Sequence, residues 1–327
     1  MRVIIRRLGF YLLTAWVAIT VNFALPRLVP GNPVAGMIGR LTEGHLCNDA
    51  CVLALQKQFG VGLNASWLSQ YASYWGDIFH GNLGYSYFES ASVGSLIGAA
   101  LPWTIGLLGL ATVLSFILGT LIGIVLGWFR GSALDWVLPG TTFFQGIPYF
   151  FLALVLLMLF GTVLKWFPIA QGYDIINTTP GWNMAYIGGV LDHGFLPALT
   201  IVLASIAGWI MGMRNMMVIT MDEDFVLVAR AKGLPSRRVV WYAARNALLP
   251  SVANFALSIS LIVAGQLLVE IVFSYPGIGK LLFDAVTQGD YPLVDGLFLV
   301  ITLVVLVANL LADVVYVFID PRARQEA

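Results

Sequence analysis

Long runs of apolar residues alternate with short polar segments along most of this chain. A helix needs roughly 20 mainly apolar residues to cross the hydrocarbon layer of a membrane. The runs that meet this length predict an all-α polytopic membrane protein with six transmembrane helices, at residues 8–28, 103–129, 136–164, 195–217, 251–272 and 293–318. The third run contains Gly140, Gly146 and Pro148, so we expect it to be kinked or broken.

The first apolar run lies where a signal peptide would lie. It is longer than the apolar region of a signal peptide, and no A-x-A-like cleavage site follows it. We therefore interpret it as an anchor that stays in the protein.

The composition agrees with a membrane protein. Hydrophobic residues make up 59% of the chain and charged residues 10%, whereas soluble domains carry about 25% charged residues. The formal net charge is zero, so no overall basic field suggests nucleic acid as a partner.

The distribution of Lys and Arg predicts the orientation. If the N-terminus is cytoplasmic, twelve of the 17 basic residues fall on the cytoplasmic side and five on the other. The positive-inside rule then gives both termini inside. The chain divides into residues 1–29 with the first span, an extracytoplasmic domain at 30–102, and a core of spans two to six at 103–327.

The extracytoplasmic domain contains four aromatic residues spaced for one helical face: Trp67, Tyr71, Tyr74 and Trp75. This face belongs either to a packed or membrane-surface helix or to a surface that contacts a ligand. The two cysteines, Cys47 and Cys51, are either bridged or free, and no third cysteine is present to build a metal site.

Motifs of catalysis are missing from the sequence. It contains no G-x-x-x-x-G-K-[ST] phosphate loop, no H-E-x-x-H and no G-x-S-x-G. The three histidines, His45, His80 and His193, show no metal-ligand spacing. We therefore expect neither an enzyme nor a chain with a metal or cofactor of its own.

Few charges lie inside the predicted spans. Glu270 and Asp295 lie near the outer ends of spans five and six, and Asp313 lies near the inner end of span six. Ionisable groups at membrane depth suggest function, so gating or contact with a solute is one interpretation. Hydrogen bonding or capping between helices is the other.

Three glycines in the second span, Gly119, Gly123 and Gly127, follow a small-xxx-small spacing. This spacing lets another helix approach closely. It does not identify that helix, which can belong to the same bundle or to a dimer partner.

The polar segment at 218–250 lies between spans four and five and holds five of the 17 basic residues. Acidic residues at its start favour the N-terminus of a helix, and Gly233 is placed to end that helix. Ser236 is a candidate N-cap of a second helix. We expect a cytoplasmic helix–turn–helix that fits a protein groove, or alternatively an amphipathic helix on anionic lipid.

Several stretches resemble one known family in the same order along the chain. They are HGNLGYSY, ARAKGL, RNALLP, VEIVFSYPGIGK, GDYPLV and NLLADVVYVFIDPRAR, together with the N-terminal MRVIIRRLGFYLLTAW. The chain resembles permease subunits of binding-protein-dependent ABC importers, in the B-type branch for dipeptides and oligopeptides. The acidic residue of the general family motif is missing, because Leu227 occupies its place.

The resemblance implies specific partners and a bacterial or archaeal plasma membrane. A homologous second permease would complete the translocation path, two cytoplasmic ATP-binding subunits would hold ATP and Mg, and an extracytoplasmic solute-binding protein would dock outside. Membrane lipid would surround the chain. The residues that would contact the ATPase and couple it to transport are Ala229, Arg230, Ala231, Lys232 and Gly233.

The solute stays open at this stage. The branch is associated with di- and oligopeptides, but some stretches also resemble members associated with oligosaccharides. A metal ion is less attractive, because the spans contain no His or Cys. A stand-alone secondary transporter is a further alternative, but we find no convincing inverted repeat.

Overall fold

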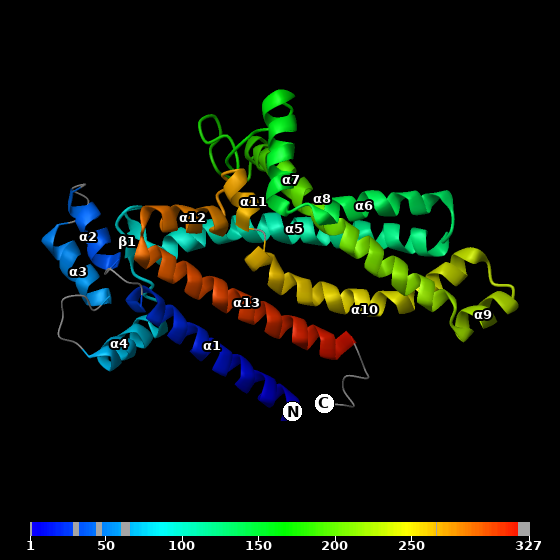
Figure 1. Ribbon diagram of the computed structural model, residues 1–327, viewed down its shortest axis with the longest axis horizontal. Helices are drawn as coiled ribbons and strands as arrows, with labels where there is room; N and C mark the ends of the chain where they lie inside the picture. Colours follow the sequence, from blue (N-terminus) through cyan, green and yellow to red (C-terminus); the bar gives the residue numbers. More distant parts are fainter. Residues whose placement is uncertain (1, 29–32, 44–47, 60–65, 266, 320–327) are drawn as a thin grey trace. The chain divides into compact units, whose positions relative to one another are not determined.

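The computed structural model describes residues 2–28, 33–43, 48–59, 66–265 and 267–319 of the 327-residue chain, and these residues are mostly helical (Figure 1). They form two compact units. Unit 1 consists of Met1–Trp103 and Pro276–Val307, and unit 2 of Thr104–Tyr275 and Ala308–Ala327. The helices α5 and α13 contribute residues to both.

Unit 1 contains the N-terminal helices, a two-stranded hairpin and two helices from the C-terminal third. They are α1 (Arg2–Leu28), α2 (Pro33–Glu43), α3 (Asp49–Phe59), α4 (Trp67–Phe79), β1 (Tyr85–Ser86), β2 (Ala91–Ser92), the start of α5 (Val93–Trp128), α12 (Ile278–Gln288) and most of α13 (Tyr291–Ile319).

The predicted aromatic face of residues 67–75 packs inside unit 1. Tyr71 and Tyr74 on α4 contact Phe23 on α1, with ring centroids 5.2 and 5.5 Å apart. Hydrogen bonds join the same helices, because the Tyr71 hydroxyl lies 2.7 Å from the Thr20 hydroxyl and Asn22 donates to Tyr74 at 3.1 Å. The interpretation as a packed helix is therefore confirmed for these two tyrosines, whereas Trp67 is 57% exposed.

Asn22 also ties α1 to α13. Its amide donates to the backbone carbonyl of Asp295 at 3.0 Å. The last turns of α1 therefore lie beside the first turns of α13. The start of α5 joins the same region, since Val93 and Ile97 pack with Leu293 and Leu297 in one buried cluster.

Cys51 on α3 belongs to another cluster, with Met37, Leu41 and Leu55 of α2 and α3. The sequence left open whether the cysteines are bridged or free, and in the structure Cys51 is disulfide-bonded. Cys47 lies outside the described residues.

Unit 2 contains the remainder of α5 and the helices between it and Tyr275. They are a 3-10 turn η1 (Ala133–Trp136), α6 (Val137–Gly146), α7 (Tyr149–Leu156), a π-helical segment η2 (Leu157–Val163), α8 (Met184–Met221), α9 (Asp224–Ala231), α10 (Ser236–Gly265) and α11 (Leu267–Val272).

The glycine stripe of α5 packs against α8. A Cβ added at Gly119 would lie 2.5 Å from the Cβ of Trp209, and one added at Gly123 would lie 2.7 Å from the Cβ of Met213. A Cβ added at Gly127 would collide with Met217. The hydroxyls of Ser115 and Ser205 continue the series at 2.8 Å. Each pair is separated by 90 positions, so the helices run parallel and in register. The predicted close approach is confirmed, and its partner is α8.

The predicted break in the third apolar run is observed. The helix α6 ends at Gly146, Ile147 and Pro148 interrupt it, and the next helical segment is bent by 100° from the first. Proline lacks an N–H donor and disfavours helical backbone at the preceding residue. Both α6 and α7 contact α8, and Figure 1 shows that α7 turns out of the direction of α6.

The count of six spans is only partly supported. Among the described residues, three helices are long and apolar enough to cross a membrane, at Val93–Trp128, Met184–Met221 and Tyr291–Leu311. The bent pair Ala133–Gly146 and Tyr149–Val163 raises the number to four if it forms one span. The first predicted span coincides with α1, whose apolar part, Gly9–Leu25, is shorter.

The fifth predicted span, at 251–272, falls on α10 and α11, and residue 266 between them lies outside the described residues. The helices α5 and α8 begin about ten residues before the predicted spans at 103 and 195. Apolar length marks the part that can lie in lipid, whereas a helix continues into water wherever its backbone bonds persist.

Candidate functional site

The polar segment folds as the predicted helix–turn–helix. We call residues 222–235 the α9 turn; it joins α8 to α10 and contains the short helix α9. Gly233 has a left-handed backbone with φ of 69°. Its N–H donates to the Arg230 carbonyl at 2.9 Å, and the N–H of Leu234 donates to Ala229 at 3.2 Å. This is the Schellman arrangement that ends a helix at glycine.

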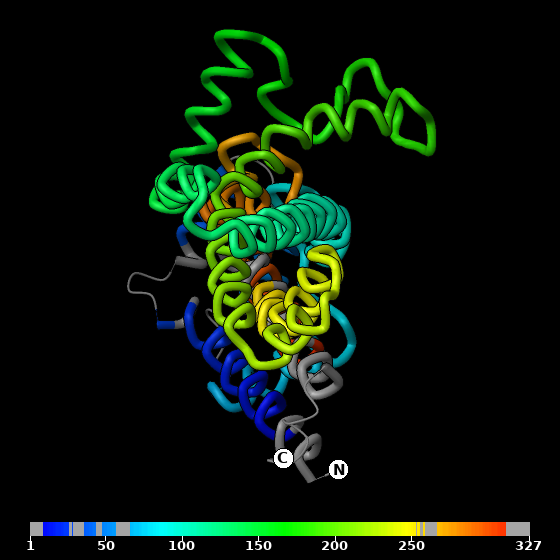
Figure 2. The backbone as a smooth tube through the Cα atoms, turned by 90° about the vertical axis from the view of Figure 1, so that its right-hand side faces the viewer, coloured from blue at the N-terminus to red at the C-terminus, as the bar shows by residue number. Residues whose placement is uncertain are grey.

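The second helix begins one residue earlier than predicted. Ser236 is the first helical residue of α10, and the Pro235 carbonyl accepts from Arg238 and Val239. Pro235 therefore occupies the capping position, and the assignment of Ser236 as N-cap was wrong. In Figure 2, the side of the structure that carries α9 faces the viewer, and the yellow chain doubles back there from the end of α8.

An internal apolar cluster fixes the α9 turn to its neighbours. Val226 and Ala229 on α9 pack with Met217 of α8 and with Val239 and Ala243 of α10. Val226 is completely buried, and Ala229 is 8% exposed. Ala229 is one of the five predicted ATPase contacts, but its side chain faces this cluster. Its methyl group stabilises the α9 turn by packing, and a contact of Ala229 with the ATPase stays a prediction.

The other four predicted contacts, Arg230, Ala231, Lys232 and Gly233, are exposed. The Arg230 guanidinium lies over the ring of Trp128 at the end of α5, 5.6 Å from its centroid. A cation over an indole face is attracted by the ring quadrupole. The exposed edge of α9 is thereby held against α5 as well as against α10.

An ion pair links the start of the α9 turn to the segment after α5. Both guanidinium nitrogens of Arg130 donate to Asp222 at 3.0 Å. The hydrogen bonds and charge of Arg130 hold the pKa of the Asp222 carboxyl below its usual value. Both groups are exposed, so solvent screens the pair and its main effect is geometric. A second pair, Arg214 with Asp135 at 3.3 Å, joins α8 to η1.

The exposure of several apolar side chains on α9 and at the start of α10 was missed in the sequence. Leu227 and Val228 are 68% and 49% exposed on α9, and Trp241 and Tyr242 are 66% and 48% exposed on α10. They lie on the helix faces opposite Val226, Ala229 and Ala243. Large apolar groups that remain exposed beside charged ones mark a surface that contacts another protein or the membrane. The helical period could have revealed the second face of α9.

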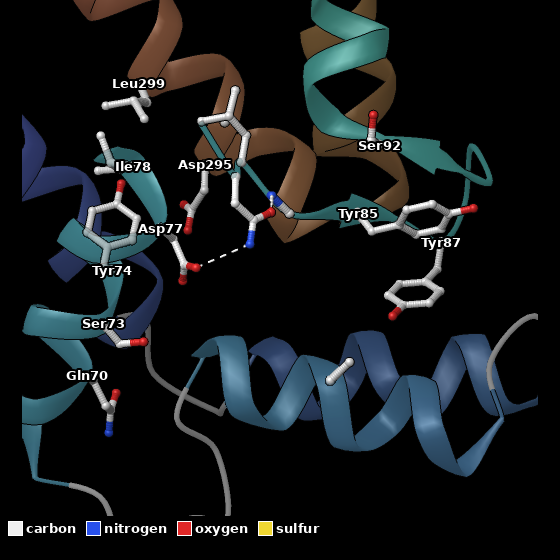
Figure 3. Close-up of a pocket in the computed structure, with 15 residues that line it drawn as sticks. Gln70, Ser73, Tyr74, Asp77, Ile78, Tyr85, Tyr87, Ser92, Asp295 and Leu299 are labelled. Atoms are coloured by element: carbon white, nitrogen blue, oxygen red, sulfur yellow. Dashed lines mark hydrogen bonds between the residues drawn. The ribbon is translucent and has the colours of Figure 1, made fainter. Parts of the chain in front are cut away.

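A cavity of about 550 Å³ lies within unit 1. Its lining mixes polar and apolar groups and includes Gln70, Tyr74, Asp77, Tyr85, Tyr87 and Asp295. Figure 3 shows the carboxyl groups of Asp77 and Asp295 directed toward the same part of the cavity, and Asn82 donates to Asp77 at 3.2 Å. Asp295 therefore lies at a cavity, and its backbone carbonyl accepts the hydrogen bond from Asn22 of α1. Contact of Asp295 with a solute stays a prediction.

The other two predicted path residues differ from Asp295. Glu270 on α11 is completely buried in unit 2, and its carbonyl accepts from the Tyr275 N–H at 2.8 Å. Its burial fits either interpretation, so gating and bonding between helices both stay predictions for Glu270. Asp313 lies on α13, but its side chain is outside the described part of the structure.

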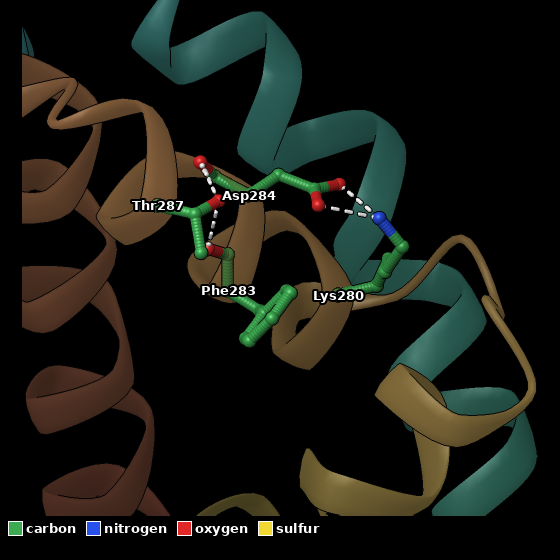
Figure 4. A network of polar contacts seen from close by, with 4 residues as sticks. All are labelled: Lys280, Phe283, Asp284 and Thr287. Carbon is green, nitrogen blue, oxygen red and sulfur yellow. Dashed lines mark hydrogen bonds and ion pairs between the residues drawn. The ribbon is translucent and has the colours of Figure 1, made fainter.

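The helix α12 of unit 1 is stabilised by polar contacts within itself, and the residue two positions after its end, Asp290, ties it to β1. Lys280 and Asp284 form an ion pair one turn apart, and the Thr287 hydroxyl donates to the Phe283 and Asp284 carbonyls at 3.0 Å (Figure 4). Gly289 then ends the helix with φ of 66°. The next residue, Asp290, is buried and accepts hydrogen bonds from the Ser86 hydroxyl and the Leu293 N–H.

Asp290 should make the stability of the folded protein depend on pH. Burial raises the pKa of its carboxyl, and Glu89 adds to this, although bonds from Ser86 and Leu293 act in the opposite direction. The folded protein then holds this proton to a higher pH than the unfolded chain. Stability should therefore fall as the pH rises from the ordinary aspartate pKa through the raised value. Thermal unfolding in detergent should show a flatter pH profile for Asp290→Asn.

The matched control for this prediction is Asp49→Asn, an equal change of charge at the exposed start of α3. It should leave the slope unchanged. If the melting temperature of Asp290→Asn changes with pH as steeply as that of the parent chain, the role assigned to Asp290 is contradicted.

These features define a class of protein. Long apolar helices and an exposed helix–turn–helix at the end of one of them, α8, describe a membrane protein. The chain belongs to the family of binding-protein-dependent transport system inner membrane components, which matches residues 119–325. It is a multi-pass inner-membrane permease that works with an ATPase and a substrate-binding protein.

Curated relatives match nearly the whole chain. The di/tripeptide transport system permease protein DppB of Pseudomonas aeruginosa is 36% identical, over 99% of this chain and 98% of its own length. The oligopeptide transport system permease protein AppB of Bacillus subtilis is 32% identical over 92% of each chain. The dipeptide transport system permease protein DppB of Escherichia coli K12 is 30% identical over 99% of this chain and 98% of its own.

Proposed function

We propose that this chain is one of two permease subunits of an ATP-driven importer of di- and oligopeptides. The observation that carries the proposal is the α9 turn, a rigid helix–turn–helix whose exposed face carries Arg230, Ala231, Lys232, Leu227 and Val228. It forms the surface that fits a groove of an ATPase. Peptide as solute rests on the relatives, whose names state dipeptide and oligopeptide transport. None of those three names states a sugar, so the oligosaccharide alternative is not favoured.

The proposed topology has six spans with both termini in the cytoplasm. Within unit 2, α5 and α8 run in the same direction, and Trp128, Asp222 and Arg130 gather where they end. Within unit 1, the end of α1 lies beside the starts of α5 and α13. Both groupings agree with an alternation in which α5, α8 and α13 run inward and α1 and α10 run outward.

The proposed assembly follows from this orientation. Two cytoplasmic ATP-binding subunits hold ATP and Mg, and one of them receives the α9 turn. A homologous second permease completes the path between the subunits. The solute-binding protein docks on the extracytoplasmic side, which includes residues 30–102. No phosphate-binding loop occurs in this sequence, so ATP hydrolysis is assigned to the partners alone.

Reconstitution of the complex tests the proposal. The permease pair, both ATPases and the binding protein are placed in liposomes, and uptake of radiolabelled alanyl-alanine is followed with ATP inside the compartment that carries the ATPases. Uptake should require ATP and the binding protein. A complex whose ATPase carries a disabled phosphate loop is the control.

Uptake that persists without ATPases would instead identify a stand-alone transporter. Transport of a cello-oligosaccharide, with no transport of any dipeptide, would replace the proposed solute by the alternative.

A further inference from the structure

A second cavity, of about 480 Å³, lies within unit 2 between five helices. Its lining comes from α5, α6, α7, α8 and α10. The side chains that carry the argument are Thr112, Gln145, Ser205, Trp209, Asn254 and Ser258. Among the described residues that line it, none is charged, about half carry a hydroxyl or an amide, and the others are mainly apolar.

The cavity lies deep along two candidate membrane spans. Thr112 and Ser205 are each 16 residues before the ends of their helices, Trp128 and Met221. At 1.5 Å per residue this is about 24 Å from the α9 turn. Polar groups at this depth in a membrane protein face a bundle interior or a water-filled space.

One of these groups lacks a partner inside the protein. Thr112 is 6% exposed, and its hydroxyl forms no hydrogen bond with the described residues. A buried hydroxyl without a bond costs free energy, on the order of 1–3 kcal/mol. Its position in the lining makes a hydrogen bond to a molecule in the cavity the natural compensation.

The helix break helps to build the cavity. Gln145 precedes the interruption at Ile147 and Pro148, and its amide nitrogen lies 3.8 Å from where a Cβ would stand on Gly208 of α8. The missing side chain at Gly208 leaves room beside this amide. On the facing helix, Asn254 is exposed, so amides from α6 and α10 flank the same space.

We infer that this cavity is this subunit's half of the translocation path, and that it recognises the peptide backbone through neutral hydrogen-bonding groups. Hydroxyl and amide side chains can pair with N–H and C=O groups, which every peptide presents. A lining without fixed charge favours neither acidic nor basic side chains of the solute. The inference rests on the proposed peptide transport.

Charge placed in the lining tests the inference. Uptake of alanyl-lysine and alanyl-glutamate is measured in the reconstituted complex, and the ratio of the two is compared with the ratio for the unchanged complex. This comparison cancels selectivity that comes from the binding protein. Asn254→Asp should raise the lysine-to-glutamate ratio, on the order of tenfold, because opposite charges attract at close range. Asn254→Lys should lower it.

Asn246→Asp is the matched control, since it makes the same change on α10 two turns away and outside the lining. Its ratio should equal that of the unchanged complex. If Asn254→Asp does not assemble, Gln145→Glu supplies the same charge from α6 and should shift the ratio in the same direction. Unchanged ratios in variants that still import alanyl-alanine would overturn the inference.

Thiol labelling provides a readout that does not depend on the solute. In Ser258→Cys, a charged, water-soluble thiol reagent should react above the level of the parent chain. Leu121→Cys, exposed on the apolar surface of α5, should not react. Failure of all dipeptide uptake together with labelling at residue 258 would refute the proposed solute while keeping the path. No labelling at residue 258 would refute the path itself.

Discussion

Gly123→Ala is expected to lower the melting temperature of the permease in detergent by several degrees. The added Cβ would lie 2.7 Å from the Met213 Cβ and 2.8 Å from the Ile210 carbonyl oxygen. A backbone oxygen cannot rotate away, so α5 and α8 would have to separate along their length. Overpacking of this kind costs about 1–3 kcal/mol. Differential scanning fluorimetry of the purified chain measures the effect.

Gly109→Ala provides the comparison on the same helix. A Cβ at Gly109 meets no atom within 4 Å, and alanine is a better helix former than glycine. Its melting temperature should be equal to or above that of the parent chain. If Gly123→Ala and Gly109→Ala have the same melting temperature, the close packing of α5 on α8 does not limit stability.

Two neighbouring alanines on α9 should fail in different ways. Ala231→Glu adds a carboxylate to an exposed position and should leave folding intact while reducing ATP-driven peptide uptake at least about tenfold, because a docking contact worth about 1.4 kcal/mol or more is lost. Ala229→Glu places the same carboxylate in the apolar cluster with Met217 and Val239. An unpaired buried charge is costly, so this variant should not accumulate as folded protein.

Both readouts are needed to separate these outcomes. Melting temperature reports folding, and the ratio of peptide uptake to ATP hydrolysis reports coupling. An Ala231→Glu complex with full uptake would remove this residue from the docking surface. A stable Ala229→Glu chain would show that α9 packs less tightly than the structure indicates.

Local signals in the sequence predicted the α9 turn well. Gly233 between two helix-forming stretches predicts a left-handed residue that ends a helix, and such a signal needs no knowledge of distant contacts. The side of α9 that is buried could not be predicted in this way. Apolar residues occur on both sides, with Val226 and Ala229 on one and Leu227 and Val228 on the other, so periodicity alone could not decide which side is buried.

Long-range partners could not be read from the sequence. The glycine stripe predicted a close helix approach, but its partner lies 90 positions away, and spacing within one helix carries no information about that distance. The neutral cavity was overlooked for a related reason. Glu270, Asp295 and Asp313 drew attention because charges in spans are rare, whereas Thr112 and Asn254 are unremarkable until five helices bring their side chains together.

The parallel register of α5 and α8 has a mechanical consequence. Three glycine contacts hold the two helices together as one stiff unit, with the proposed ATPase-docking surface at one end and Thr112 and Ser205 about 24 Å from it. A tilt of about 10° at the docking end would carry these hydroxyls sideways by about 4 Å, the scale of one side chain. Such a pair of helices would transmit a push over about 24 Å without a hinge in α8 between Ser205 and Met221, since the proline of α8, Pro197, lies outside this stretch.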